Sequence, residues 1–160
     1  MDKSTLQAFA TRVTQANRSE LVVVIYEVAL ASIKEGRDAL EAGAIADARH
    51  EIERAKSMIQ ELMYALDMHY NISTYLRQLY IFGYRELCQG IAYRDPERFD
   101  HTTNILEGLL KSFKEIAEKD DSAPLMKNTQ TIVAGLTYGP GSDLRETIGV
   151  GVNPSRGFRA

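Results

Sequence analysis

The chain has 160 residues, a net charge of −3 and a single cysteine. A disulfide within the chain is therefore excluded, and an acidic balance without a basic run argues against a nucleic-acid-binding protein. No apolar run approaches the roughly 20 residues that a membrane-spanning helix needs, and the N-terminus has no apolar signal core, so we expect a cytoplasmic protein without membrane insertion.

The first long helix is predicted over residues 18–41. Asn17 followed by Glu20 resembles a capping box, which marks a helix start, and Gly43 is suited to end the helix. The stretch LVVVIY that begins at Leu21 has the composition of a strand, but apolar residues then continue at helical spacing. The apolar surface of this helix is too broad for a single seam, so we expect it to be covered on more than one side.

Three further helices are predicted over residues 45–69, 71–93 and 96–119. In each, apolar residues recur in steps of three and four, which places them on one stripe of a helix. Asn71 is suited to cap the second of these helices, and the run Asp95-Pro96-Glu97 marks the start of the third. Because short connections make neighbouring helices antiparallel, the sequence predicts an all-α fold, an antiparallel up-down four-helix bundle.

The composition of the chain changes at about residue 120. Six of the 11 glycines and three of the four prolines follow that position. This predicts a helical-bundle domain over residues 1–119, with a short N-terminal cap segment, and a Gly/Pro-rich, loop-rich extension over residues 120–160. The glycines of the extension do not form a phosphate-binding loop, since no lysine stands at the required spacing. We expect the extension to dock on the bundle of its own or a neighbouring chain through an apolar string: Ile132, Val133, Leu136 and Tyr138.

The sequence contains no convincing catalytic or metal-binding constellation. A di-iron bundle needs Glu-x-x-His on two helices, and the chain has one near match, from Asp47 to His50. Cys88 has no second cysteine with which to form a metal or redox motif. We therefore predict that the protein is not an enzyme and needs no cofactor or metal. A ferritin-like metal-binding bundle and a generic helical adaptor are the alternatives.

Three short motifs follow one another along the predicted helices. The first reads VTQANRSEL from Val13 and continues as IYEVA from Ile25. The second is AKSMIQEL from Ala55, followed by ALD, and the third is LRQLY from Leu76. In order and spacing these motifs resemble the signatures of the FliS family of flagellar secretion chaperones, over about residues 9–119.

The motifs depart from the family signatures at a few positions. Asn17 and Arg18 stand where the family usually has Ser-Pro, and Val28 stands where it usually has glycine. Ile81 and Phe82 follow the third motif, where the family often continues Asp-Tyr. Asn17 is still able to cap the helix, so the structural role of the first motif is kept.

The resemblance implies a cytoplasmic export chaperone. Such a chaperone binds the disordered C-terminal segment of flagellin, prevents premature polymerisation and keeps flagellin competent for flagellar type III secretion. Contacts with export-gate or regulatory proteins are left open, as is the oligomeric state.

The flagellin segment is expected to lie as an amphipathic helix in an apolar groove. Phe9 and Val13 are expected to form a movable cover over part of that groove. The alternative for each groove residue is a place in the core. The predicted groove residues are apolar and tyrosine positions: Leu21, Ile25, Tyr26, Leu66, Leu76, Leu79, Tyr80 and Tyr84.

Overall fold

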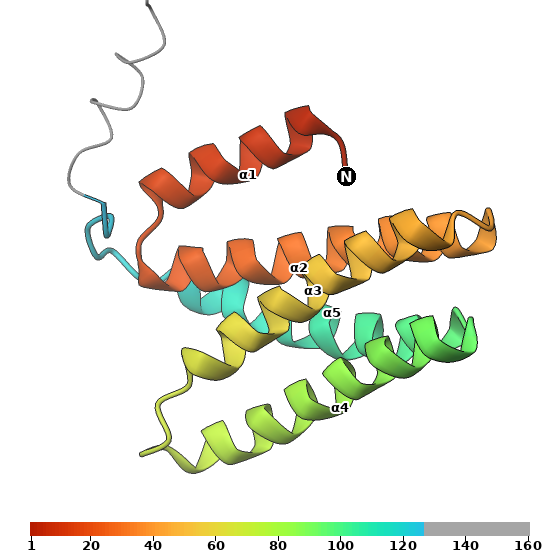
Figure 1. The fold of residues 1–160 in the computed structure, drawn as a ribbon. Helices are drawn as coiled ribbons and strands as arrows, with labels where there is room; N and C mark the ends of the chain where they lie inside the picture. Colours follow the sequence, from red (N-terminus) through yellow and green to blue (C-terminus); the bar gives the residue numbers. More distant parts are fainter. Residues whose placement is uncertain (127–160) are drawn as a thin grey trace, which may run out of the picture. The chain divides into compact units, whose positions relative to one another are not determined.

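The part of the chain that the structure describes, residues 1–126 of a computed structural model, is all-helical, as predicted (Figure 1). The predicted docking residues of the C-terminal extension, Ile132, Val133, Leu136 and Tyr138, lie outside the described residues. The described helices are α1 (Lys3–Gln15), α2 (Arg18–Glu41), α3 (Ile45–Tyr64), α4 (Asn71–Tyr93) and α5 (Glu97–Ala117).

Both ends of α2 form as predicted. The side chain of Asn17 accepts a hydrogen bond from the backbone N–H of Glu20, and the Glu20 carboxylate accepts one from the backbone N–H of Asn17. This reciprocal capping box satisfies two donors that the helix itself leaves without partners. At the other end, Gly43 has a φ of 76°, which glycine adopts without strain, and its N–H donates to the carbonyl of Leu40.

Other helix ends or their caps differ from the prediction. Helix α5 is capped by Pro96, which was expected as its first residue after the cap Asp95, and it ends at Ala117. The segment expected to be a short cap is the 13-residue helix α1, which begins after the capping residue Asp2. Asn71 is the first residue of α4 and not its cap, which is Tyr70. Helix α3 ends before residue 65 because Asp67 folds the chain into a turn, in which its carboxylate accepts a hydrogen bond from the backbone N–H of His69.

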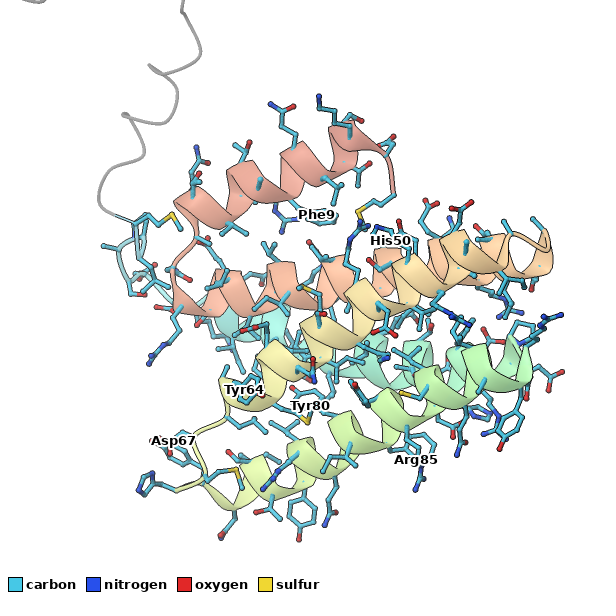
Figure 2. The ribbon with its side chains drawn as sticks, viewed as in Figure 1. Phe9, His50, Tyr64, Asp67, Tyr80 and Arg85 are labelled. Carbon is cyan, nitrogen blue, oxygen red and sulfur yellow. The ribbon has the colours of Figure 1, made fainter. Side chains whose placement is uncertain are left out.

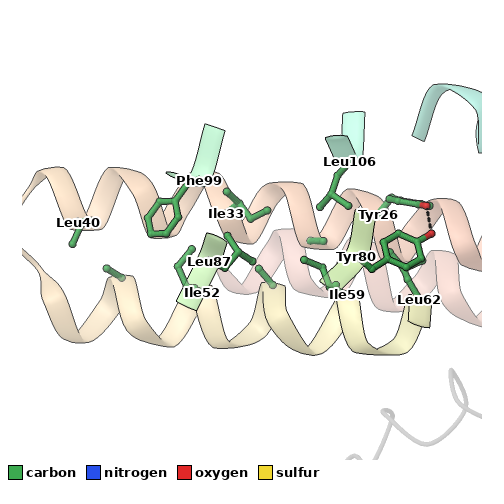
Figure 3. Packing of buried hydrophobic residues seen from close by; sticks show 13 residues of the cluster. Tyr26, Ile33, Leu40, Ile52, Ile59, Leu62, Tyr80, Leu87, Phe99 and Leu106 are labelled. Atoms are coloured by element: carbon green, nitrogen blue, oxygen red, sulfur yellow. Dashed lines mark hydrogen bonds between the residues drawn. The ribbon is translucent and has the colours of Figure 1, made fainter. Parts of the chain in front are cut away.

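Helices α2 to α5 share one hydrophobic core. α2 and α4 each pack against α3 and α5, whereas α1 contacts α2 alone among the described elements. Successive helices from α2 to α5 run in opposite directions (Figure 1). The largest fully buried side chains come from all four of these helices (Figure 3): Tyr26, Ile33, Ile52, Ile59, Tyr80, Leu87, Phe99 and Leu106.

Two tyrosines from helices that are not neighbours meet inside this core. The hydroxyl groups of Tyr26 on α2 and Tyr80 on α4 hydrogen-bond to each other (Figure 3). Burial raises the pKa of both phenols, so both stay protonated at physiological pH. Each hydroxyl therefore satisfies the hydrogen-bonding requirement of the other, which offsets the cost of burying them.

Removal of either hydroxyl alone is predicted to destabilise the fold. Tyr26→Phe or Tyr80→Phe leaves one buried hydroxyl without its partner, at a cost of about 1–3 kcal/mol in the free energy of unfolding. The double variant leaves no unpaired hydroxyl and should cost clearly less than the sum of the two single variants. Urea denaturation followed by circular dichroism measures all four proteins. Strictly additive losses would show that the two hydroxyls do not depend on each other.

Candidate functional site

The structure separates the eight predicted groove residues into groups that do not share one surface. Tyr26 and Tyr80 are buried, at 0% and 1% exposure, which corrects their prediction as groove residues, because each satisfies the other's hydroxyl in the core. Leu79 is exposed on α4. The remaining residues are partly buried, and all of them except Leu21 pack against the core: Leu21, Ile25, Leu66, Leu76 and Tyr84.

A second apolar surface of α2 lies outside the core. Val23 and Val24 are 6% and 2% exposed, yet neither belongs to the core cluster that α2 to α5 share. Both line a cleft of about 440 Å³ between α1, α2 and α5, whose lining also includes Arg12 and Gln15 of α1. We call Val23 and Val24 the α1-covered strip. The sequence pointed to surplus apolar surface on this helix but did not identify these two residues.

Helix α1 contributes Arg12 and Gln15 to the wall of this cleft and buries no residue of its own. Phe9 and Val13 are half-buried, and Leu6 is 37% exposed. Phe9 lies on the side of α1 that faces α2 (Figure 2). Because hydrophobic stabilisation scales with the apolar area removed from water, partial burial of these few side chains attaches α1 only weakly.

Charged groups add to the attachment of α1 at both of its ends. The Arg12 guanidinium donates a hydrogen bond to one carboxylate oxygen of Glu27 on α2, and the Lys114 ammonium of α5 lies 2.8 Å from the other oxygen. Glu27 therefore joins three helices. Near the start of α1, the amino group of Met1 donates to the buried carboxylate of Glu51 on α3 at 2.7 Å.

The pKa of Glu27 shows which protonation state this arrangement favours. Burial tends to raise the pKa of Glu27, but hydrogen bonds from Lys114 and Arg12 outweigh burial and hold it below its ordinary value. A group with a lowered pKa contributes stability above its unfolded-state pKa and loses it as the pH falls through the folded-state pKa. The contribution of Glu27 to the attachment of α1 is therefore present at neutral pH and lost on acidification, and salt weakens it by screening the ion pairs.

The segment that follows α5 returns to the junction of α1 and α2. The Asn17 side chain donates to the backbone carbonyl of Asp120 at 2.8 Å, and the Ser19 hydroxyl donates to the Asp120 carboxylate. The backbone N–H of Leu125 donates to the carbonyl of Ala16 at 3.1 Å. The α1–α2 junction is thus held against the end of α5 independently of the α1-covered strip.

The described residues offer no grouping of side chains for metal chemistry. Within residues 1–126, no three His, Cys, Asp or Glu side chains come together as a metal ion would require. His50, half of the near match to a di-iron motif, is exposed and lies 3.2 Å from a guanidinium nitrogen of Arg54. None of the helices within residues 1–126 has the length and apolar character needed to cross a membrane.

Comparison with known proteins gives one result for the whole helical body. Residues 1–120 match the family model described as "Flagellar protein FliS". The match covers three quarters of the chain, includes all five described helices and confirms the family that the three sequence motifs indicated. No curated protein gives a significant match to the sequence.

Substitution of Glu27 is predicted to loosen α1 while α2 to α5 stay folded. Glu27→Gln removes the charge that holds Arg12 and Lys114, so trypsin should cleave after Arg12 about two to ten times faster at neutral pH and low salt. Glu107→Gln, a change at an exposed acid of α5, is the matched control and should leave this cleavage unchanged. Mass spectrometry of a digestion time course gives the rates. Equal rates in the two variants would show that Glu27 does not hold α1.

Proposed function

Since the chain belongs to the FliS family, whose members are flagellar export chaperones, we propose that it binds the disordered C-terminal segment of flagellin before export. Occupation of that segment prevents flagellin from polymerising in the cytoplasm and keeps it competent for flagellar type III secretion. The up-down four-helix bundle predicted for α2 to α5 is part of this proposal, as the rigid platform on which flagellin becomes ordered.

We assign the first contact of flagellin to the α1-covered strip. The observation that supports this assignment is that Val23 and Val24 are buried outside the core and line a cleft with α1, a helix that buries no residue of its own. An amphipathic helix with apolar residues on one face is chemically equivalent to α1 with its Phe9 and Val13. A flagellin helix is therefore able to replace α1 on α2, which makes α1 a movable cover.

Because flagellin replaces α1 on the strip, the strip itself contributes little to the free energy of binding. Val23 and Val24 are buried before and after the exchange, so their transfer from water nearly cancels. Ordering a disordered segment costs roughly 2–5 kcal/mol or more, and such interfaces commonly reach on the order of 2,000 Å² or more in total. The flagellin segment must therefore extend beyond the area of α1, and Leu21 and Ile25 on the same helix are the nearest predicted groove residues.

The cover also lowers the apparent affinity for flagellin. Only molecules with α1 detached bind, so the apparent dissociation constant is the intrinsic constant divided by the detached fraction. Loss of apolar contacts from α1 raises that fraction and strengthens binding. Loss of apolar character from the strip has the opposite effect, because α1 and flagellin compete for the same side chains.

Substitutions in α1 are expected to raise the affinity for flagellin, and a substitution in the α1-covered strip is expected to lower it. The double variant Phe9→Ser/Val13→Ser should bind a labelled flagellin C-terminal peptide more tightly, by up to about tenfold for each 1.4 kcal/mol of cover contact removed. Val23→Asp in the same background should weaken binding at least about tenfold, because a carboxylate then faces the apolar side of the peptide. Fluorescence anisotropy at fixed salt measures both constants.

A control variant and two contrary results sharpen this experiment. Tyr93→Ser, a change at a residue that is 72% exposed at the end of α4, should leave flagellin affinity unchanged, and circular dichroism verifies that every variant is folded. Unaltered binding by the Val23→Asp variant would overturn the assignment to the strip alone. No binding of flagellin by the folded parent chain would overturn the proposed function and favour a helical adaptor for another partner.

A further inference from the structure

The C-terminal extension begins beside the cleft that contains the α1-covered strip. After α5 the chain returns to the start of α2 (Figure 1), where the backbone N–H of Leu125 donates to the carbonyl of Ala16 at 3.1 Å. Ala16 is itself part of the cleft wall. Leu125 and Met126, the last two described residues, are 56% and 47% exposed. The described part of the chain therefore ends on an exposed apolar pair next to this cleft.

The apolar string of the extension is within reach of the whole cleft. Six residue steps separate Met126 from Ile132, and an extended chain of that length spans at most about 20 Å. The cleft is shorter than this, because its α2 side runs from Glu20 to Val24, which is about 6 Å along a helix axis. Its volume of about 440 Å³ lies in the range of pockets that enclose a small ligand. Ile132 and the apolar residues that follow it are therefore able to enter the cleft.

Most of the charged groups in the cleft wall already have partners within the helical body. Arg12 and Lys114 both pair with Glu27. The carboxylate of Glu20 accepts a hydrogen bond from a backbone N–H in its capping box, and Glu118, the remaining charged residue of the wall, is exposed. A charged occupant would lose hydration in this cleft without gaining a free counter-ion, so an uncharged apolar segment fits it better.

The extension contains such a segment. Residues 128–142 include no Asp, Glu, Lys or Arg, whereas Lys127 and Asp143 border them. The large apolar side chains of this segment are the four that were predicted to dock: Ile132, Val133, Leu136 and Tyr138. Covalent attachment favours the segment of the same chain over that of a second copy, because a short linker gives an effective concentration on the order of millimolar.

We propose that residues 132–138 of the extension dock in this cleft and hold α1 on α2. A segment in the cleft contacts the walls that α1, α2 and α5 contribute, so α1 loses these contacts when it detaches. The consequence for flagellin rests on the proposed function. Because flagellin reaches the α1-covered strip only after α1 has detached, a docked extension lowers the detached fraction and weakens flagellin binding. The docking itself does not depend on flagellin.

Hydrogen exchange on the full chain tests the docking without flagellin. Ile132→Asp/Leu136→Asp places carboxylates in the segment, so the amides of α1 should exchange about two to ten times faster than in the parent chain. Val150→Asp/Val152→Asp makes the same kind of change elsewhere in the extension and should leave α1 exchange unaltered. Ala117→Phe adds a large side chain to the cleft wall and should speed the exchange of residues 132–138. Equal α1 exchange in the two double variants would overturn the proposal.

Two further measurements separate the proposal from its competitors. In the parent chain, the protection of residues 132–138 should be the same at two protein concentrations about a hundredfold apart. Protection that is lost on dilution would show that a second copy supplies the cleft, which would overturn docking within one chain.

The double variant Ile132→Asp/Leu136→Asp should also bind the flagellin C-terminal peptide about two to ten times more tightly than the parent chain. Faster α1 exchange without tighter flagellin binding would overturn the effect on flagellin. Failure of every folded variant to bind flagellin would overturn the proposed function, whereas the docking would still be supported by the exchange rates. Circular dichroism verifies that each variant is folded.

Discussion

The constraint on which the described structure depends is the apolar character of α2 on two sides. One side, with Tyr26, forms the centre of the core that α2 shares with the other long helices. Val23 and Val24, which lie outside that core, are also shielded from water. In the free chain α1 packs beside these residues. In the proposed complex flagellin takes the place of α1. Helix α1 and flagellin therefore each keep the same apolar residues of α2 away from water.

The junction of α1 and α2 makes this exchange of covers geometrically possible. Ala16 is extended, with a ψ of 139°, and the Asn17 capping box starts a new helix immediately afterwards. Without this break α1 would continue the axis of α2 and could not return over its apolar side. The same junction is fixed from outside by Asp120, so α1 is able to detach while the start of α2 keeps its caps. The hydrogen bonds that fix the α1–α2 junction are thus different from the contacts that hold α1 on α2.

Much of the fold could be predicted from periodicity and capping, and the limits of the prediction have physical causes. The bounds of α2 and the role of Gly43 follow from local chemistry, which the sequence contains directly. Helix α1 was missed as a helix because it buries no residue, so its apolar pattern is sparse. Tyr26 and Tyr80 were misplaced because the pairing of two hydroxyls across a core depends on which helices face each other. Periodicity along one helix does not contain that information.

In the proposed function, α1 and flagellin compete for one apolar strip of α2. Hydrogen exchange followed by mass spectrometry on the full chain, with and without the flagellin C-terminal peptide, tests this most directly. If α1 is displaced, the backbone amides of residues 3–15 should exchange faster when the peptide is bound, while those around Val23 and Val24 stay protected. Unchanged or slower exchange of the α1 amides in the complex would contradict it, because α1 would then remain in place beside the cargo.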